Sequence, residues 1–172
     1  LDLRWGKVWV LGQMSRWDVF EETIIQAIER SAENNNEWIW LNNEQLGEGS
    51  QGFIAGLQDY QMQLLNTYED SLLKRMRNIG NTVLEYYPEN VENLTNVAIT
   101  HILTGEFEEA VSLLDKAIAL RPKDTIVLCN LAQCHRDLGN TEEALAYYNK
   151  AMEYGDAETR AFVTEELELL KK

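Results

Sequence analysis

Apolar residues recur every three to four positions along most of this 172-residue chain, which is the spacing of one buried face on an α-helix. The pattern predicts helices over 3–14 and 17–32, and again over 51–66 and 67–87. Between these pairs, residues 33–50 are rich in asparagine and glycine, and this composition predicts a connecting loop. The sequence therefore predicts an all-α protein.

The C-terminal half contains an internal repeat of 34 residues. Residues 91–124 align with residues 125–158, and Pro88 and Pro122 keep the same spacing. The identical pairs are Leu94/Leu128, Asn96/Asn130, Ala98/Ala132, His101/His135, Gly105/Gly139, Glu108/Glu142, Glu109/Glu143, Ala110/Ala144, Lys116/Lys150 and Ala117/Ala151. We expect each copy to fold as the same supersecondary unit.

Each copy has the features of two antiparallel helices joined by a tight turn. The buried face of the first helix is predicted to consist of Leu94, Val97 and Ala98, and of Leu128, Leu131 and Ala132. Gly105 and Gly139 follow these helices, where the backbone often needs a left-handed conformation. Ala110 and Ala117 are seven residues apart, so they allow two helix axes to approach closely. Pro122 then ends the second helix.

The turn from Gly105 to Ala110, with the sequence GEFEEA, resembles the tetratricopeptide repeat. This resemblance covers 68 of the 172 residues (2 × 34). It implies a right-handed α-solenoid, or α-α superhelix, with a concave groove lined by the first helices. The second copy departs from the family pattern at Thr141, where an aromatic residue is usual, and at Asp156, where proline is usual.

The segments outside the two repeats are interpreted as parts of the same solenoid. Residues 1–32 form an N-terminal helical pair, 51–90 a degenerate repeat-like pair, and 159–172 a C-terminal capping helix. In the capping helix the residues expected to face the repeats are Phe162, Val163, Leu167 and Leu170. The residues expected to face outward are Glu165, Glu166, Glu168, Lys171 and Lys172.

The resemblance also implies a partner-binding groove on the first helices. Its expected residues are Glu92, Thr95, Asn96, Ile99, Ile102, Ile126, Asn130, Gln133, Arg136 and Arg160. Asn96 and Asn130 are predicted to hydrogen-bond the backbone of an extended peptide, and the isoleucines to contact its apolar side chains.

One subset of the family binds acidic chaperone tails through a two-carboxylate clamp of lysine, asparagine and arginine. The corresponding positions here are Thr95, Ile99, Asn130, Arg160 and Thr164, of which Asn130 and, loosely, Arg160 agree. The loss of most cations argues against capture of such a tail.

The charge of the chain narrows the choice of partners. There are 15 basic and 29 acidic residues, giving a net charge of −14. Such a surface repels phosphate, so nucleic acid and anionic membrane surfaces are disfavoured. No apolar run reaches the roughly 20 residues needed to cross a bilayer. The chain starts without an initiator Met or a signal pattern, and this start suggests a processed or truncated protein. Both a cytoplasmic location and an exported or periplasmic one therefore stay open.

Neither a cofactor nor a metal site is predicted. His101, His135 and Cys134 are too few for a structural zinc site, which usually needs four ligands. Cys129 and Cys134, five residues apart on one helix, point to different sides and are interpreted as small buried residues. No nucleophile elbow, phosphate loop or zinc-protease motif occurs.

The sequence thus predicts a non-enzymatic scaffold that binds a peptide or protein partner, with its oligomeric state open. One alternative is a carbohydrate or small-ligand binder that uses the tryptophan-rich N-terminal helices and the 33–50 loop. Its aromatic residues would be Trp5, Trp9, Trp17, Trp38 and Trp40. Another alternative is a repeat module of a larger exported protein.

Overall fold

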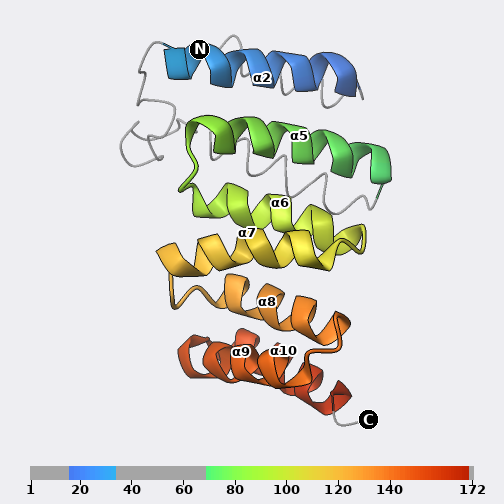
Figure 1. Ribbon diagram of the computed structural model, residues 1–172, viewed down its shortest axis with the longest axis vertical. Helices are drawn as coiled ribbons and strands as arrows, with labels where there is room; N and C mark the ends of the chain where they lie inside the picture. Colours follow the sequence, from blue (N-terminus) through green and yellow to red (C-terminus); the bar gives the residue numbers. More distant parts are fainter. Residues whose placement is uncertain (1–15, 34–68, 171–172) are drawn as a thin grey trace. The chain divides into compact units, whose positions relative to one another are not determined.

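The computed structural model describes residues 16–33 and 69–170, and every regular element within them is an α-helix (Figure 1). The helices are α2 (Trp17–Glu33), α5 (Asp70–Tyr86), α6 (Val91–Leu103), α7 (Phe107–Leu120), α8 (Thr125–Asp137), α9 (Thr141–Tyr154) and α10 (Ala157–Leu169). The predicted helices 3–14 and 51–66 lie outside the described residues, as does nearly all of the predicted loop 33–50. The chain divides into two compact units, Leu1–Pro88 and Glu89–Lys172. The prediction of an all-α protein is confirmed.

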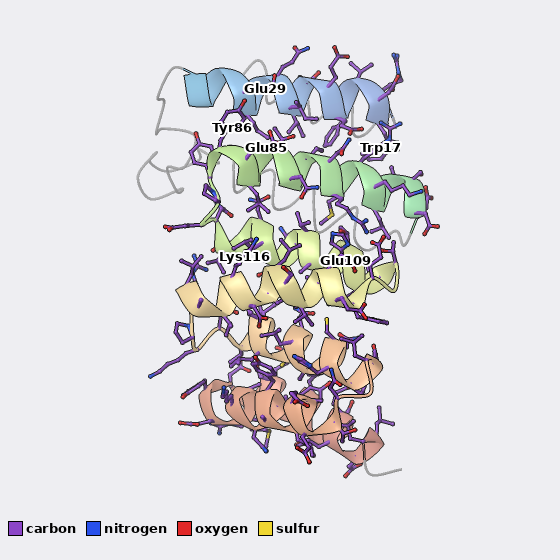
Figure 2. The ribbon with its side chains drawn as sticks, viewed as in Figure 1. Trp17, Glu29, Glu85, Tyr86, Glu109 and Lys116 are labelled. Atoms are coloured by element: carbon purple, nitrogen blue, oxygen red, sulfur yellow. The ribbon has the colours of Figure 1, made fainter. Side chains whose placement is uncertain are left out.

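In the first unit α2 packs against α5. The buried apolar residues are Phe20, Ile24 and Ile28 on α2, and Leu72, Leu73, Met76, Ile79 and Val83 on α5. Trp17 makes an edge-to-face contact with Phe20, with ring centroids 5.5 Å apart (Figure 2). Glu21 accepts hydrogen bonds from Arg75 Nη1 at 2.7 Å and from Asn78 Nδ2 at 2.9 Å. An apolar seam with a polar link therefore joins the two helices.

The second unit consists of two helical hairpins, α6–α7 and α8–α9, followed by α10. Both hairpin turns contain a glycine with positive φ, +77° at Gly105 and +80° at Gly139. The N–H of Gly105 donates to Ile102 O at 3.1 Å, and the N–H of Glu106 donates to His101 O at 2.8 Å. The second turn repeats this bonding at Gly139 and Asn140. This is the Schellman geometry, so the predicted left-handed glycines are confirmed.

Small side chains lie where the helices of the second unit approach one another. Ala110, Ala117, Ala144 and Ala151 are all fully buried. A core cluster joins α8, α9 and α10 through Leu128, Ala132, Tyr148, Ala151 and Val163. The surface of α7 carries the exposed Glu109 and Lys116 (Figure 2). The predicted pattern of apolar faces and small contact residues is therefore confirmed in both repeats.

The capping helix differs from its prediction at two positions. Val163 is buried, and Leu167 and Leu170 pack on the core cluster, as expected. Phe162, however, is 43% exposed, and the side chain of Glu166 is only 16% exposed. Helical spacing explains both corrections, because residues 163, 166, 167 and 170 form one face at intervals of three and four. Glu166 therefore lies on the face that packs against the repeats, and Phe162 lies at the exposed edge of this face.

Helices α6, α8 and α10 start after similar capping residues but at unequal intervals along the chain. Asn90, Asp124 and Asp156 cap α6, α8 and α10, and each side chain accepts a backbone N–H of the following turn. Helix α8 begins 34 residues after α6 (125 − 91), whereas α10 begins 32 residues after α8 (157 − 125). The link between α9 and α10 is therefore two residues shorter than the link between α7 and α8.

Candidate functional site

A groove of about 530 Å³ lies between α8 and α10 in the second unit. The lining residues are Thr125, Ile126, Cys129 and Asn130 from the α8 side, and Asp156, Glu158, Thr159 and Phe162 from the α10 side. Two large apolar side chains stand in its walls, Ile126 at 64% exposure and Phe162 at 43%. Exposed apolar side chains in a concave surface are typical of binding sites.

The short α9–α10 link decides which residues of α10 reach this groove. Ile126 and Asn130 are the second and sixth residues of α8, and Glu158 and Phe162 are the second and sixth residues of α10. All four line the groove. A strict 34-residue period would have placed Arg160 and Thr164 at these positions, but neither lines it. Arg160 instead donates from Nε to the carbonyl oxygen of Met152 at 3.1 Å.

The predicted site residues on α6 are less accessible than those on α8. Thr95 and Asn96 are 8% and 9% exposed, and Thr95 Oγ1 donates to Val91 O at 2.9 Å. Ile99 and Ile102 are half-buried. Glu92, also half-buried, forms an ion pair with Arg121 whose N···O distance is 2.6 Å. The accessible groove therefore lies along α8 and α10, and α6 contributes no lining residue to it.

Arg136 of α8 forms an ion pair that connects this helix to α10. Its guanidinium pairs with Asp137 at 2.8 Å through Nε, and with Glu166 of α10 through Nη1. The hydroxyl of the fully buried Tyr148, on α9, donates to the same Glu166 carboxylate at 2.9 Å. The hydrogen bond to Asp137 raises the pKa of Arg136, and burial raises the pKa of Tyr148. This cluster links α8, α9 and α10 through the Glu166 carboxylate. Gln133, a further predicted site residue, lies one turn before Arg136 on α8 and is half-buried.

Asn130 and Cys129 form part of the α8 wall. Asn130 Nδ2 donates to Ile126 O at 2.9 Å, which leaves its Oδ1 to accept a further hydrogen bond. Burial raises the pKa of Cys129 to about 11 and that of Cys134 to about 12, with smaller contributions from Glu166 and Asp137 respectively. Both thiols therefore stay protonated at neutral pH, and a protonated thiol is a poor nucleophile. Cys129 contributes an apolar surface to the groove.

The histidines are engaged within their own repeats. His101 Nδ1 lies 2.9 Å from Glu106 Oε2, which also accepts a hydrogen bond from Thr104 Oγ1 at 2.8 Å. His135 stacks on Tyr147 with ring centroids 5.5 Å apart. Within residues 16–33 and 69–170, no group of three or more His, Cys, Asp or Glu side chains could hold a metal ion. None of the helices described there has the length and apolar character needed to cross a bilayer.

Comparison with known proteins agrees with this architecture. The tetratricopeptide repeat profile matches residues 91–156. A solved structure of a MamA point mutant superposes with a TM-score of 0.53 at 17% sequence identity, covering 91% of this chain and 98% of the other. A crystal structure of MamA gives a TM-score of 0.53 at 13% identity, covering 84% and 74% respectively. No curated protein sequence matches the chain.

At these identities the structural likeness shows a shared fold, and the predicted α-solenoid of helical hairpins is confirmed. Repeats of this family support a protein-interaction scaffold in general, and they are typically non-catalytic. Residues 91–156 of this chain are therefore similar to tetratricopeptide repeats.

Proposed function

We propose that the protein is a non-enzymatic scaffold that holds a peptide or protein partner in the groove between α8 and α10. The observation that carries the proposal is the exposure of Ile126 and Phe162 on facing walls of one groove. Burying both side chains against a partner would remove apolar surface from water, which is the main favourable term in association.

Two of the residues predicted for the partner-binding groove, Ile126 and Asn130, also line the groove between α8 and α10, which supports this choice of site. The proposed site is therefore centred on Ile126, Cys129, Asn130, Glu158 and Phe162. Arg136 and Arg160 are proposed to support it from behind, through their bonds to Glu166 and to Met152. Glu92, Thr95, Asn96, Ile99, Ile102 and Gln133 belong to the same first-helix face and remain a proposed extension of the site.

The alternative of a carbohydrate site gains no specific support. Trp17 is the single tryptophan within the described residues, and its ring is half-buried against Phe20. A tryptophan that packs in this way has part of its ring covered, which reduces the surface it could offer a sugar ring.

The proposal is tested by capturing partners from a native lysate with the full chain and with an Ile126→Ser, Phe162→Ser variant. The matched control is Leu120→Ser, Leu145→Ser, which removes two large exposed side chains, 42% and 36% exposed, away from the groove. A partner that the control retains and the groove variant loses supports the proposal. Equal retention by all three proteins would refute it, provided that circular dichroism shows equal folding.

A further inference from the structure

The charged residues that line the α8–α10 groove are of one sign. The two that line it are Asp156 and Glu158, both exposed, and no basic side chain from the described part of the chain lines it. Hydrogen bonds from the backbone N–H and from the side chain of Thr159 lower the pKa of Asp156, so its carboxylate stays ionised well below neutral pH. Residues 121–170 as a whole carry ten acidic and five basic residues. The groove therefore has a negative rim at the end where α10 begins.

The five cations of residues 121–170 are all engaged elsewhere. Arg121 pairs with Glu92, Arg136 with Asp137 and Glu166, and Arg160 with Met152 O. Lys123 lies over the Tyr154 ring and Lys150 over the Tyr147 ring, each with Nζ 5.2 Å from the ring centroid. None of these contacts reaches the carboxylates of Asp156 or Glu158. A ligand could therefore supply the missing positive charge.

The apolar and polar parts of the groove are arranged in order along it. Asp156 and Glu158 lie in the cap and first turn of α10, and Phe162 lies one turn further along, opposite the wall that holds Ile126 and Asn130. Successive turns of a helix are about 5.4 Å apart, a distance that two residues of an extended peptide span. A ligand with a cationic side chain and an apolar side chain two residues apart would direct both into the groove and meet both parts at once.

We infer that the groove takes a basic, apolar peptide segment, with a lysine or arginine at Asp156 and Glu158 and a large aliphatic or aromatic side chain between Ile126 and Phe162. Asn130 Oδ1 accepts a backbone N–H of this segment. The inference rests on the proposed function and specifies the partner's chemistry. An acidic tail is excluded from this groove by repulsion from the two carboxylates.

The probe for the test is a random dodecapeptide display library, selected on the immobilised full chain at about 50 mM salt, where exposed charges are weakly screened. Enriched peptides are then synthesised and titrated by fluorescence anisotropy against three variants. The rim variant is Asp156→Asn, Glu158→Gln, which keeps a good helix cap. Its control is Glu142→Gln, Glu143→Gln, an equal charge change in the first turn of α9. The wall variant is Ile126→Ser, Phe162→Ser.

We expect enrichment of lysine or arginine two residues from leucine or an aromatic residue. The rim variant should weaken binding by about tenfold, corresponding to two exposed ion pairs. The control should stay within about twofold, and the wall variant should abolish binding. Peptides that require the walls but are acidic or neutral, or that bind the rim variant as well as wild type, would overturn the inference and leave the proposed function standing. Failure to enrich any wall-dependent peptide would overturn both.

Discussion

At the residue scale, glycines occupy two kinds of position for different physical reasons. Gly139 has φ +80°, and a Cβ added there would meet no atom within 4 Å. Gly155 has an ordinary φ of −76°, but an added Cβ would lie 2.6 Å from Thr159 Cβ and 2.7 Å from Ala151 O. Backbone conformation requires glycine at the first position, whereas space requires it at the second.

The first prediction concerns Gly139. Gly139→Ala should lower the free energy of unfolding by about 1–2 kcal/mol, because a Cβ disfavours the left-handed backbone. Gly139→Asn should cost less, because asparagine tolerates that conformation. Urea denaturation followed by circular dichroism measures both changes. Equal costs for alanine and asparagine would show that the left-handed turn does not limit this position.

The second prediction concerns the two cysteines. Because burial raises their pKa values to about 11 and about 12 from 9.0, the folded protein keeps thiol protons that the unfolded chain loses above pH 9. The free energy of unfolding should therefore be unaffected by the thiols below pH 9 and fall as the pH rises toward 12. Tyr147 and Tyr148, whose pKa values burial also raises from 10.0, add to this fall at higher pH.

Urea titrations at pH 7, 9 and 10.5 measure the effect of pH on stability. Cys134→Ala should show a shallower fall between pH 9 and 10.5 than wild type, even where its stability at pH 7 is lower. The same slope in both proteins would contradict the assignment of a raised pKa to this thiol.

At the scale of single elements, the face of α10 could be predicted from the sequence only in part. The apolar spacing identified Val163, Leu167 and Leu170 correctly. Glu166 belongs to the same face by helical spacing, but a charged residue at a buried position contradicts the apolar pattern. Its partners, the Tyr148 hydroxyl and Arg136, come from helices 18 and 30 residues earlier. Pairing over such distances is set by tertiary structure, which local periodicity does not reveal.

The third prediction concerns this three-helix link. Tyr148→Phe should lower the free energy of unfolding by about 1–3 kcal/mol, because it removes a buried hydrogen bond to a carboxylate. The control Tyr154→Phe removes a hydroxyl from a ring that is 40% exposed and should cost little. A double-mutant cycle with Glu166→Gln should then show coupling for Tyr148 and none for Tyr154. Additive effects at Tyr148 would argue against the link.

The candidate site was predictable to the extent that the repeat is regular. Ile126 and Asn130 follow from their positions in the second repeat, and both line the groove. Glu158 and Phe162 also line the groove, and the sequence did not predict this because the 34-residue period was extended past α9, where the link is two residues shorter. A sequence signal did exist, since Asn90, Asp124 and Asp156 are all good helix caps, and counting from each cap gives the observed register.

At the scale of the whole molecule, the chain comprises two compact units. The α2–α5 seam lies within the first unit, and the cluster around Leu128 and Tyr148 lies within the second. Repeat proteins derive their stability from such neighbouring contacts, so damage to one group of helices need not spread to the next.

The fourth prediction follows from this division. Ile24→Ala, at a fully buried position of α2, should cost about 2–5 kcal/mol locally. Amide hydrogen exchange should rise in α2 and α5 and stay at the wild-type level in α8 and α9. Leu128→Ala should give the reverse pattern. Exchange that rises through all the described helices in either variant would show that this part of the chain unfolds as one cooperative unit.

The short link after α9 also bears on how quickly a ligand can bind. Gly155 lies close to Thr159, and Tyr148 and Arg136 hold Glu166, so α10 can move away from α8 only by breaking these contacts. The walls of the groove are therefore already in place before a ligand arrives, and little ordering remains to be done on contact. Ligands of different affinity should then associate at similar rates, and they should differ mainly in how long they stay bound.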